Sequence, residues 1–547
     1  MHTSLRTPMP YSCREPTPMS SETFLPPGAR NQTDVFAVHG ADPEVLAYAM
    51  AKYSRSALSM RESLAEISTQ RAEQFLNTFY FQYGHRSIAD LAHIAMAIER
   101  LSLLAAIVLV DEQRWDGQER STRYQNFMKS GWYFPDFGTD AASGHLYAET
   151  IENLFATYQR TTAAVLEALR RRVPCPETLK ADAYERTLKA RAFDVARYLL
   201  PLATNTSLGQ IVNARTLETQ VSRLLSHPMA EVRDLGIKLR DAATGPAWNV
   251  NGNAGAALVE KLRAADPALA EEAANLLTRE VRTAPTLVKY AEPNQYEMQT
   301  REELAAAAAE ILKGLPIADA PVVDLVERTE TLEVELAATL LYSASHHPYR
   351  QIRDLVAALP EARVAEIVEL GLRDRGRHDE ALRAFHAGAA LRFDILMDIG
   401  GFRDMHRHRR CVQIIQGFTT LHGYETPANG DLGPDVNLLA EAGMLADYQA
   451  AIEQAHAASA KIAAGTAGED GQSGLYLLPL GTRIRSLFKM DFAEAQYISE
   501  LRSGPAGHFS YRRVAWEMYL ALKRQHPALA RHVRVTDFTE PIDLLQR

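Results

Sequence analysis

The chain repeats itself, and this repetition limits most strongly how it can fold. Tyr53-Ser-Arg-Ser56 recurs as Tyr342-Ser-Ala-Ser345, and Leu199-Leu-Pro-Leu-Ala-Thr204 recurs as Leu477-Leu-Pro-Leu-Gly-Thr482. Each match is short, but the two pairs keep the same order and similar separations along the chain. We therefore predict two copies of one domain. A duplicated domain is often a fused homodimer, which can build its sites across the interface between the copies.

The segments around the repeats set the expected domain boundaries. We predict a disordered tail over residues 1–33, a first domain over 34–295, a helical linker over 296–320 and a second domain over 321–547. The tail is rich in Pro, Ser and Thr and poor in large aliphatic residues, as disordered segments are. It has no apolar region of the kind that a secretory signal needs.

The apolar pattern predicts helices mixed with strands in both copies. Residues 88–110 predict a strand followed by a helix, and 146–172 and 176–200 predict long helices. Residues 213–215 lie at the start of another helix, and 393–399 predict a further strand. The polar residues that interrupt this pattern are the candidates for a functional site.

Composition and charge exclude several classes of protein. The net charge is −9, whereas general nucleic-acid binders usually carry a basic surface, so any anion site must be a local pocket. The longest apolar run, 101–110, is far shorter than the roughly 20 residues that cross a membrane. The three cysteines are far apart: Cys13, Cys175 and Cys411. They indicate neither a disulfide framework nor a metal site, so we predict a cytoplasmic protein without a metal.

One short stretch of the second copy gathers positive charge directly after the strand-like run 393–399. Four arginines alternate there with two histidines: Arg403, His406, Arg407, His408, Arg409 and Arg410. Guanidinium groups repel one another and are seldom buried alone, but their planar fork binds phosphate or carboxylate through two hydrogen bonds. The stretch is therefore either an anion site or a solvated basic turn.

The first copy contains polar clusters that suit a sugar phosphate. Glu119, Ser121 and Arg123 alternate, so an extended backbone would point them to one face. Asn213 and Arg215 lie at a helix start, where free backbone N–H groups favour anions. A surface salt bridge or a helix cap would explain the same residues without a ligand. Two further candidates are single arginines in apolar surroundings: Arg197 before Leu-Pro-Leu and Arg502 before Ser-Gly-Pro.

These residues resemble, in duplicated form, the motifs of the flavin-dependent thymidylate synthase family. That family has Arg-His-Arg, then Glu-x-Ser-x-Arg-Tyr, an Arg ahead of Leu-Pro-Leu, Asn-Ala-Arg and a Leu-Arg pair. The first copy matches at Glu119–Tyr124, Arg197, Leu200–Leu202 and Val212–Leu217, with Ser87 and Asp90 after Gly84-His85 where the family has Thr and Glu. The second copy matches at Arg407–Arg409, Leu478–Leu480 and Leu501-Arg502.

The departures from the family pattern are complementary. The first copy has Asp111-Glu-Gln113 in place of Arg-His-Arg, and Arg223-Leu224 in place of Leu-Arg. The second copy lacks the remaining motifs and carries these residues instead: Ile415, Gly417, Thr419, Leu475 and Asp491-Phe-Ala493. Each copy has lost what the other kept, which a site assembled across the two copies requires.

The resemblance implies a fold and a reaction. The fold is α+β, with mixed helices around a small sheet in each copy, and the copies pack as an intramolecular pseudo-dimer. The family is a homotetramer, which implies a homodimer of pseudo-dimers here. It binds FAD, dUMP and methylene-tetrahydrofolate, uses NADPH as reductant, and makes dTMP without a cysteine nucleophile. Cys411 is accordingly expected to be a small filler.

Site residues follow from the same resemblance. The flavin would be held by Arg407, His408, Arg409, Asn213, Arg215, Ser54, Ser87 and Asp90. The nucleotide would be held by Glu119, Ser121, Arg123, Arg197 and Arg502. The residues closest to the chemistry would be Arg407, His408, Arg409 and Arg502. Two alternatives stay open: a diverged paralogue that binds flavin or nucleotide but modifies another pyrimidine or none, and nucleic-acid binding through residues 403–410.

Overall fold

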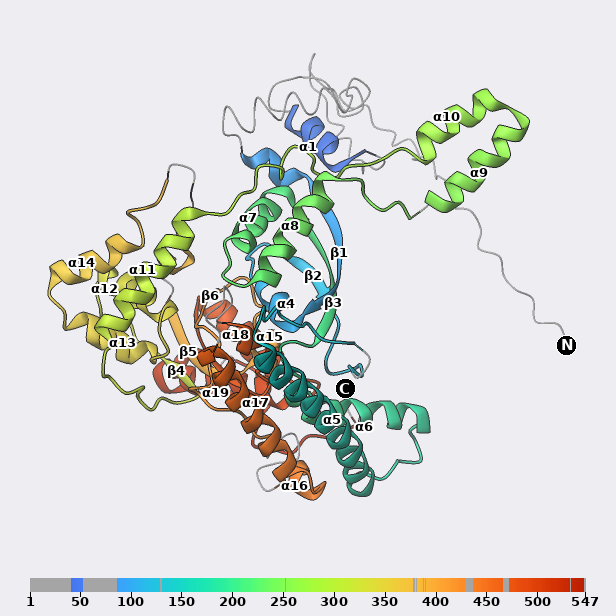
Figure 1. Ribbon diagram of the computed structural model, residues 1–547. Helices are drawn as coiled ribbons and strands as arrows, with labels where there is room; N and C mark the ends of the chain where they lie inside the picture. The colour runs from blue at the N-terminus through green and yellow to red at the C-terminus, as the bar shows by residue number, and fades with distance from the viewer. Residues whose placement is uncertain are drawn as a thin grey trace, which may run out of the picture. The chain divides into compact units, whose positions relative to one another are not determined.

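In the computed structural model of the chain, two small antiparallel sheets are each accompanied by helices (Figure 1). The structure describes residues 41–52, 86–127, 130–250, 252–376, 379, 381–386, 388, 390–427, 436–465, 472–531 and 533–545. The chain divides into the units Met1–Ala41 and Asp42–Arg547, and all elements named below belong to the second unit.

The first half of the chain builds a three-stranded sheet in the order β1-β3-β2. Its elements are α1 (Pro43–Lys52), η2 (Arg86–Leu91), β1 (His93–Ser102), α4 (Leu103–Leu109), β2 (Asp116–Glu119), α5 (Ala141–Arg172), α6 (Ala181–Ala196), η3 (Arg197–Leu199), β3 (Asn205–Asn213), α7 (Ala214–Leu225), α8 (Ala230–Thr244), α9 (Gly252–Ala265) and α10 (Pro267–Leu277). Both β1 and β2 pair antiparallel with β3, so the short strand β2 ends beside the middle of β3.

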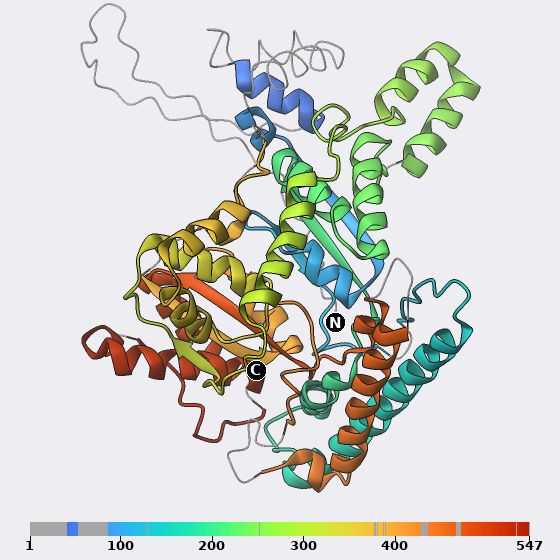
Figure 2. The same cartoon turned by 60° about the vertical axis from the view of Figure 1, so that its left-hand side comes forward.

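The second half builds a four-stranded sheet in the order β4-β5-β7-β6. After α11 (Gln295–Ile311), its elements are β4 (Val323–Leu325), α12 (Leu332–Ser343), α13 (Tyr349–Ala357), α14 (Glu361–Leu370), η4 (Arg383–Phe385), β5 (Leu391–Asp398), α15 (Ile399–Met405), β6 (Val412–Ile415), α16 (Leu438–Glu441), α17 (Leu445–Gly465), η5 (Ser473–Leu477), β7 (Arg483–Met490), α18 (Phe492–Ser503), α19 (Phe509–Gln525) and α20 (Pro527–Ala530). The helices α12 and α19 pack on opposite faces of this sheet (Figure 2).

The two halves repeat one order of elements. The series β1, α4, β2, α5, η3, β3, α7, α8 corresponds to β5, α15, β6, α17, η5, β7, α18, α19. Three of the paired elements have the same length: α4 and α15 have 7 residues, β2 and β6 have 4, and α7 and α18 have 12. Acceptor side chains begin paired helices at paired positions, Ser102 with Asp398 and Asn213 with Asp491. The internal repetition predicted from the sequence is confirmed.

The Leu-Pro-Leu segments are where the two halves meet. Four backbone hydrogen bonds of 2.8–3.0 Å join them in reciprocal pairs: Leu202 N to Leu478 O, Leu480 N to Leu200 O, Ala203 N to Tyr476 O, and Gly481 N to Tyr198 O. Reciprocal contacts between equivalent residues are those of a two-fold symmetric interface. The helices α5 and α17 also pack together, and one apolar core runs through both halves.

Most of the elements predicted from the sequence are present in the structure, and one helix is shorter than predicted. The strand and helix predicted over 88–110 are present as β1 and α4, and the strand predicted over 393–399 is present as β5. The helix predicted over 176–200 is shorter, because η3 follows α6 and Leu200 is extended ahead of Pro201. The helix α11 covers much of the predicted linker and packs against α12 and α14. The domain boundaries themselves stay predictions.

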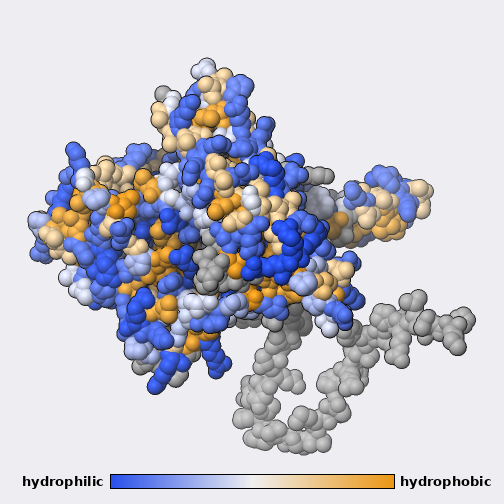
Figure 3. Space-filling model, turned by 90° about the horizontal axis from the view of Figure 1, so that it is seen from below, coloured by the Kyte–Doolittle hydropathy of each residue, from blue (hydrophilic) through white to orange (hydrophobic). Residues whose placement is uncertain are grey.

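The molecular surface is mixed in character. On the face shown in Figure 3 hydrophilic residues predominate and apolar residues occur in small groups. Among the described residues, no helix combines the length and apolar character needed to cross a membrane.

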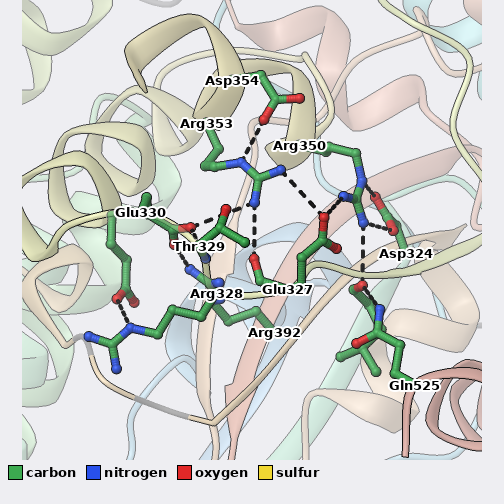
Figure 4. Close-up of polar contacts among 12 residues, drawn as sticks. Asp324, Glu327, Arg328, Thr329, Glu330, Arg350, Arg353, Asp354, Arg392 and Gln525 are labelled. Atoms are coloured by element: carbon green, nitrogen blue, oxygen red, sulfur yellow. Dashed lines mark hydrogen bonds and ion pairs between the residues drawn. The ribbon is translucent and has the colours of Figure 1, made fainter. Parts of the chain in front are cut away.

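A network of ion pairs fastens the edge strand β4 to the helix α13 (Figure 4). Arg350 donates to both oxygens of Asp324 at 2.9 Å and to Glu327 at 2.6 Å. Arg353 donates to the backbone carbonyl of Glu327 at 3.0 Å. The hydrogen bond from Arg350 lowers the pKa of Glu327 to about 2.

This network predicts a pH dependence of stability. Because the pKa of Glu327 is lowered on folding, its contribution is present above the unfolded value, about 4.3, and is lost as the pH falls towards 2. We expect Arg350→Gln to lower the free energy of unfolding by roughly 1 kcal/mol at pH 7, since the pair is partly exposed. Urea unfolding at pH 7 and pH 3.5 measures both effects. Arg363→Gln, which removes only exposed ion pairs, is the control, and equal pH profiles for the two variants would contradict this role of Arg350.

Candidate functional site

Asp404 lies at the centre of an arginine cluster drawn from both halves. It is the sixth residue of α15, a helix that Asp398 caps through Gly401 N. Arg197, from the end of α6, reaches Asp404 Oδ2 at 3.3 Å. Burial raises the pKa of Asp404, but four nearby arginines lower it overall: Arg197, Arg123, Arg407 and Arg502. The Asp404 carboxylate is therefore ionised.

Arg197 has unused hydrogen-bonding capacity. Its side chain is 2% exposed, and its Nε and Nη2 atoms are buried without a hydrogen-bond partner in the protein. Buried guanidinium nitrogens are nearly always paired, and an unpaired one is costly. These two donors therefore point to an anionic ligand.

Arg123 is held rigidly in the same cluster. It donates to the two oxygens of Asp194 at 2.7 and 3.1 Å and to the Tyr511 hydroxyl at 2.8 Å. Burial opposes its charge, but Asp194 outweighs this and raises the pKa of Arg123. The expectation of an extended backbone from Glu119 to Arg123 is wrong: β2 ends at Glu119 and a turn follows. The turn aims Arg123 inwards, whereas Ser121 accepts from Arg123 N at 3.2 Å.

Glu119 joins the halves by an ion pair with Arg403, and both side chains are 11% exposed. Arg403 precedes Asp404 on α15, so this pair anchors the last turn of that helix against β2. The alternative that Glu119 and Arg123 form a surface salt bridge does not fit, because their partners are Arg403 and Asp194.

Arg502 and His408 form a contact at the edge of the cluster. Arg502 Nε donates to His408 Nε2 at 2.7 Å, so the imidazole accepts through this nitrogen. Burial, together with Arg502 and Arg409, lowers the pKa of His408 to about 3. The ring is therefore neutral at pH 7. The Arg502 guanidinium also lies over the Tyr511 ring, 5.4 Å from its centroid.

Three further candidate flavin residues, Arg409, Arg215 and Asp90, each contact another side chain. Arg409 lies over the Trp115 ring at 4.5 Å, and its Nε atom is buried and unpaired. Arg215 pairs with Asp90 at 2.9 Å, and Arg114, next to Trp115 in the chain, is 3.7 Å from Asp90.

The structure describes three of the four other predicted flavin residues. Asn213 caps α7 by accepting from Thr216 N at 2.9 Å, and Arg407 is exposed. Ser87 lies on η2, and Ser54 lies outside the described residues.

The equivalent position on the opposite side is occupied by two ion pairs, one of which joins the two halves. By the matched helices α4 and α15, Asp111 and Glu112 correspond to Arg407 and His408. Asp111 pairs with Arg383 of the second half, and Glu112 pairs with Arg223 at 2.8 Å. Burial raises the pKa of Asp111, but Arg383 and its neighbours lower it well below its usual range.

The cluster around Asp404 has no counterpart at the position of Asp111 and Glu112. Paired residues there, taken from the matched helices and strand registers, are uncharged: Val108 for Asp404, Thr419 for Arg123, Leu475 for Arg197, Leu224 for Arg502, Val232 for Tyr511 and Met229 for His508. One of the two related positions therefore carries the arginine cluster, and the other does not.

Three residues of the cluster were missed in the sequence: Asp404, Asp194 and Tyr511. His508 is fully buried and donates from Nε2 to Asp194 O at 2.8 Å. A single signal was available for Asp404, a carboxylate inside an arginine-rich run. Asp194 and Tyr511 lie on helices α6 and α19, and nothing in their local sequence marks them.

The described residues offer neither a nucleophilic thiol at the cluster nor a metal centre. Cys411 is buried, and burial raises the pKa of its thiol to about 12, which confirms the expectation of a small filler. No group of three or more described His, Cys, Asp or Glu side chains is arranged to hold a metal ion.

Comparison with known proteins agrees with this duplicated arrangement. The model of the family described as thymidylate synthase complementing protein matches two segments, residues 37–244 and 324–528. The UPF0159 protein of Chlamydia muridarum is 28% identical over 533 residues, which cover 91% of each chain. A flavin-dependent thymidylate synthase of Clostridium tetani is 24% identical over 225 residues, 39% of this chain and 86% of that protein.

Among solved structures, the Helicobacter pylori flavin-dependent thymidylate synthase ThyX, complexed with FAD and dUMP, aligns with 17% identity and a TM-score of 0.25. The alignment covers 37% of this chain and 89% of that one. The family match, in contrast, extends over both halves and includes every motif quoted from the sequence after residue 37. The chain therefore belongs to the flavin-dependent thymidylate synthase family, and carries two segments of that family in tandem.

Proposed function

We propose that the chain is an FAD-dependent thymidylate synthase-like enzyme. It methylates dUMP to dTMP, with methylene-tetrahydrofolate as the carbon donor and NADPH as the reductant, in a site shared by the two halves of an intramolecular pseudo-dimer. The observation that carries the proposal is the cluster at Asp404, where Arg123 and Arg197 of the first half meet Arg407 and Arg502 of the second.

The charge of the cluster suits a nucleoside monophosphate. Its positive members are Arg123, Arg197, Arg403, Arg407 and Arg502, and its carboxylates are Glu119, Asp194 and Asp404. Arginines outnumber the carboxylates among these side chains, and a phosphate monoester carries about −1.5 to −2 at pH 7. The unpaired Nε and Nη2 of Arg197 are the donors that such a phosphate would accept from.

The residues beside the cluster fit a flavin. Arg407, His408 and Arg409 would lie along the cofactor, and Asn213, Arg215, Asp90, Ser87 and Ser54 would complete its site. The Nε atoms of Arg409 and Arg215 are buried and unpaired, which suits binding of an anionic ligand. When bound, FAD supplies the hydride chemistry, and the protein supplies orientation and electrostatics. The neutral His408 can offer one N–H without adding charge.

The cationic side chains also suit the reaction itself. Arg407 and Arg502 near the pyrimidine oxygens would stabilise negative charge that develops on the ring. Cys411, with a pKa raised to about 12 by burial, is a poor nucleophile, which fits a reaction that uses none.

The second position is expected not to bind ligands. An FAD pyrophosphate there would meet Asp111 and Glu112 in place of Arg407 and His408, and a nucleotide phosphate would meet Thr419 and Leu475. We expect one flavin and one nucleotide per chain, and a homodimer of pseudo-dimers would then hold two of each.

Flavin content and product formation test the proposal together. We expect purified protein to bind one FAD per chain and to form dTMP from dUMP when NADPH and methylene-tetrahydrofolate are added. If the protein binds neither FAD nor dUMP, the proposal is contradicted. Flavin and nucleotide binding without turnover would favour the diverged paralogue, and two flavins per chain would contradict the single site.

A further inference from the structure

We infer that Tyr511 is a positioning residue that couples the nucleotide-binding arginine of the first half to the arginine–histidine pair of the second. The inference rests on the proposed function for the identity of the ligands. It concerns a residue that none of the family motifs quoted above contains.

Tyr511 contacts an arginine from each half. Its hydroxyl accepts from Arg123 Nη1 at 2.8 Å, and its ring lies under the Arg502 guanidinium with 5.4 Å to the centroid. Burial raises the pKa of Tyr511, so it remains a phenol at neutral pH. A neutral hydroxyl can accept from Arg123 without cancelling the charge that a phosphate needs.

The surroundings fix Tyr511 in place. It is the third residue of α19, and its side chain is 5% exposed. His508 begins this helix by accepting from Ser510 N at 3.2 Å, and Arg512 donates to Ser503 O at 3.1 Å. The buried ring lies between the two arginines and separates them.

The contacts through Tyr511 form a continuous path between the halves. Asp194 holds Arg123, Arg123 donates to Tyr511, Tyr511 supports Arg502, and Arg502 donates to His408. The first end of the path belongs to the proposed nucleotide site and the last to the proposed flavin site. Tyr511 thereby fixes the position of Arg123 relative to Arg502 and His408.

The tyrosine occurs only where the path is needed. The third residue of the equivalent helix α8 is Val232, which has neither a hydroxyl nor a ring. The position related by the repeat lacks the arginines as well, with Thr419 and Leu224 in their places. Tyrosine and arginines thus coincide on the same side of the repeat.

Two substitutions separate the contacts. Tyr511→Phe removes the hydroxyl but keeps the ring under Arg502, and Tyr511→Leu removes both. We expect Tyr511→Phe to raise the KM for dUMP about tenfold, as for loss of a hydrogen bond to a charged group, with kcat and flavin content little changed. We expect Tyr511→Leu to lower kcat as well, and to abolish the change in flavin absorbance that dUMP induces.

A matched control lies on the same helix. Tyr519 stacks beside Trp516, with ring centroids 5.3 Å apart, and Tyr519→Phe should leave KM, kcat and the absorbance change as in the wild type. If Tyr511→Phe behaves like this control, or if it lowers only the unfolding temperature, Tyr511 is merely structural and the inference is overturned.

The outcome also separates this inference from the proposed function. If wild-type protein binds dUMP and FAD but forms no dTMP, calorimetric titration with dUMP still decides, because Tyr511→Phe should weaken binding about tenfold. If wild-type protein binds FAD and dUMP and Tyr511→Phe binds dUMP equally well, only the role of Tyr511 fails. If wild-type protein binds no dUMP, both fail.

Discussion

Arg197→Gln is expected to abolish binding of dUMP. Glutamine cannot supply the two buried, unpaired donors of Arg197 to a phosphate, and it removes one of the charges that surround Asp404. Hydrogen bonds to charged groups contribute about 1.5–3 kcal/mol each, so the loss of two should weaken binding by at least about 100-fold. Calorimetric titration with dUMP measures the affinity directly.

Two further variants make this result interpretable. Arg172→Gln removes an ion pair of 2.8 Å with Glu441, which also joins the halves but lies on the surface, and it should leave dUMP affinity unchanged. Arg197→Lys keeps the charge without the planar fork, so an intermediate affinity is expected. If Arg197→Gln is folded and binds dUMP within about threefold of the wild type, the cluster at Asp404 is not the nucleotide site.

Replacing Arg407, His408 and Arg409 by Asp, Glu and Gln is expected to abolish flavin binding. The three new residues are those that the first half carries at the equivalent position. Two positive charges are replaced by two negative ones, which would repel the FAD pyrophosphate. The ratio of flavin to protein after purification, and after titration with FAD, measures the loss.

A substitution at the equivalent position of the first half provides the control. Asp111→Asn leaves Arg383 without its charged partner, which should lower the free energy of unfolding by about 1–3 kcal/mol. It should not change the flavin content, because Asp111 belongs to the position that we expect not to bind ligands. Flavin retained in the triple variant, or lost equally from Asp111→Asn, would place the flavin elsewhere.

Much of the architecture was predictable because the repeats fall on structurally essential positions. The Leu-Pro-Leu segments are conspicuous in the sequence, and they form the reciprocal contact between Leu202 and Leu478. Polar residues at helix starts, such as Asn213, were equally informative, because a helix cap has local sequence requirements. The complementary loss of motifs then predicted that the site would draw on both copies.

The electrostatic partners within the site were not predictable in the same way. Arg123 was expected on an extended strand, but a turn directs it to Asp194, a residue on a separate helix. Tyr511 joins Arg123 only because α19 and the turn after β2 converge, and no local pattern specifies such a contact. Burial of the Asp111 carboxylate beside Arg383 likewise depends on how the halves pack.

The duplication allows the two related positions to differ in their residues. In a symmetric homodimer each substitution appears at both positions, so neither can lose a charge without the other. In a fused chain Asp111 and Arg407 are free to differ, and one position has become an ion-paired contact between the halves. The other carries the arginines around Asp404.

A crystal structure of the full chain with FAD and dUMP tests the shared site most directly. We predict one FAD and one dUMP per chain, with the dUMP phosphate in contact with Arg197 of the first half and the same nucleotide in contact with Arg502 of the second. FAD should lie along Arg407–Arg409 and reach Arg215. Ligands contacted by residues of one half alone, or bound at both related positions, would contradict the account.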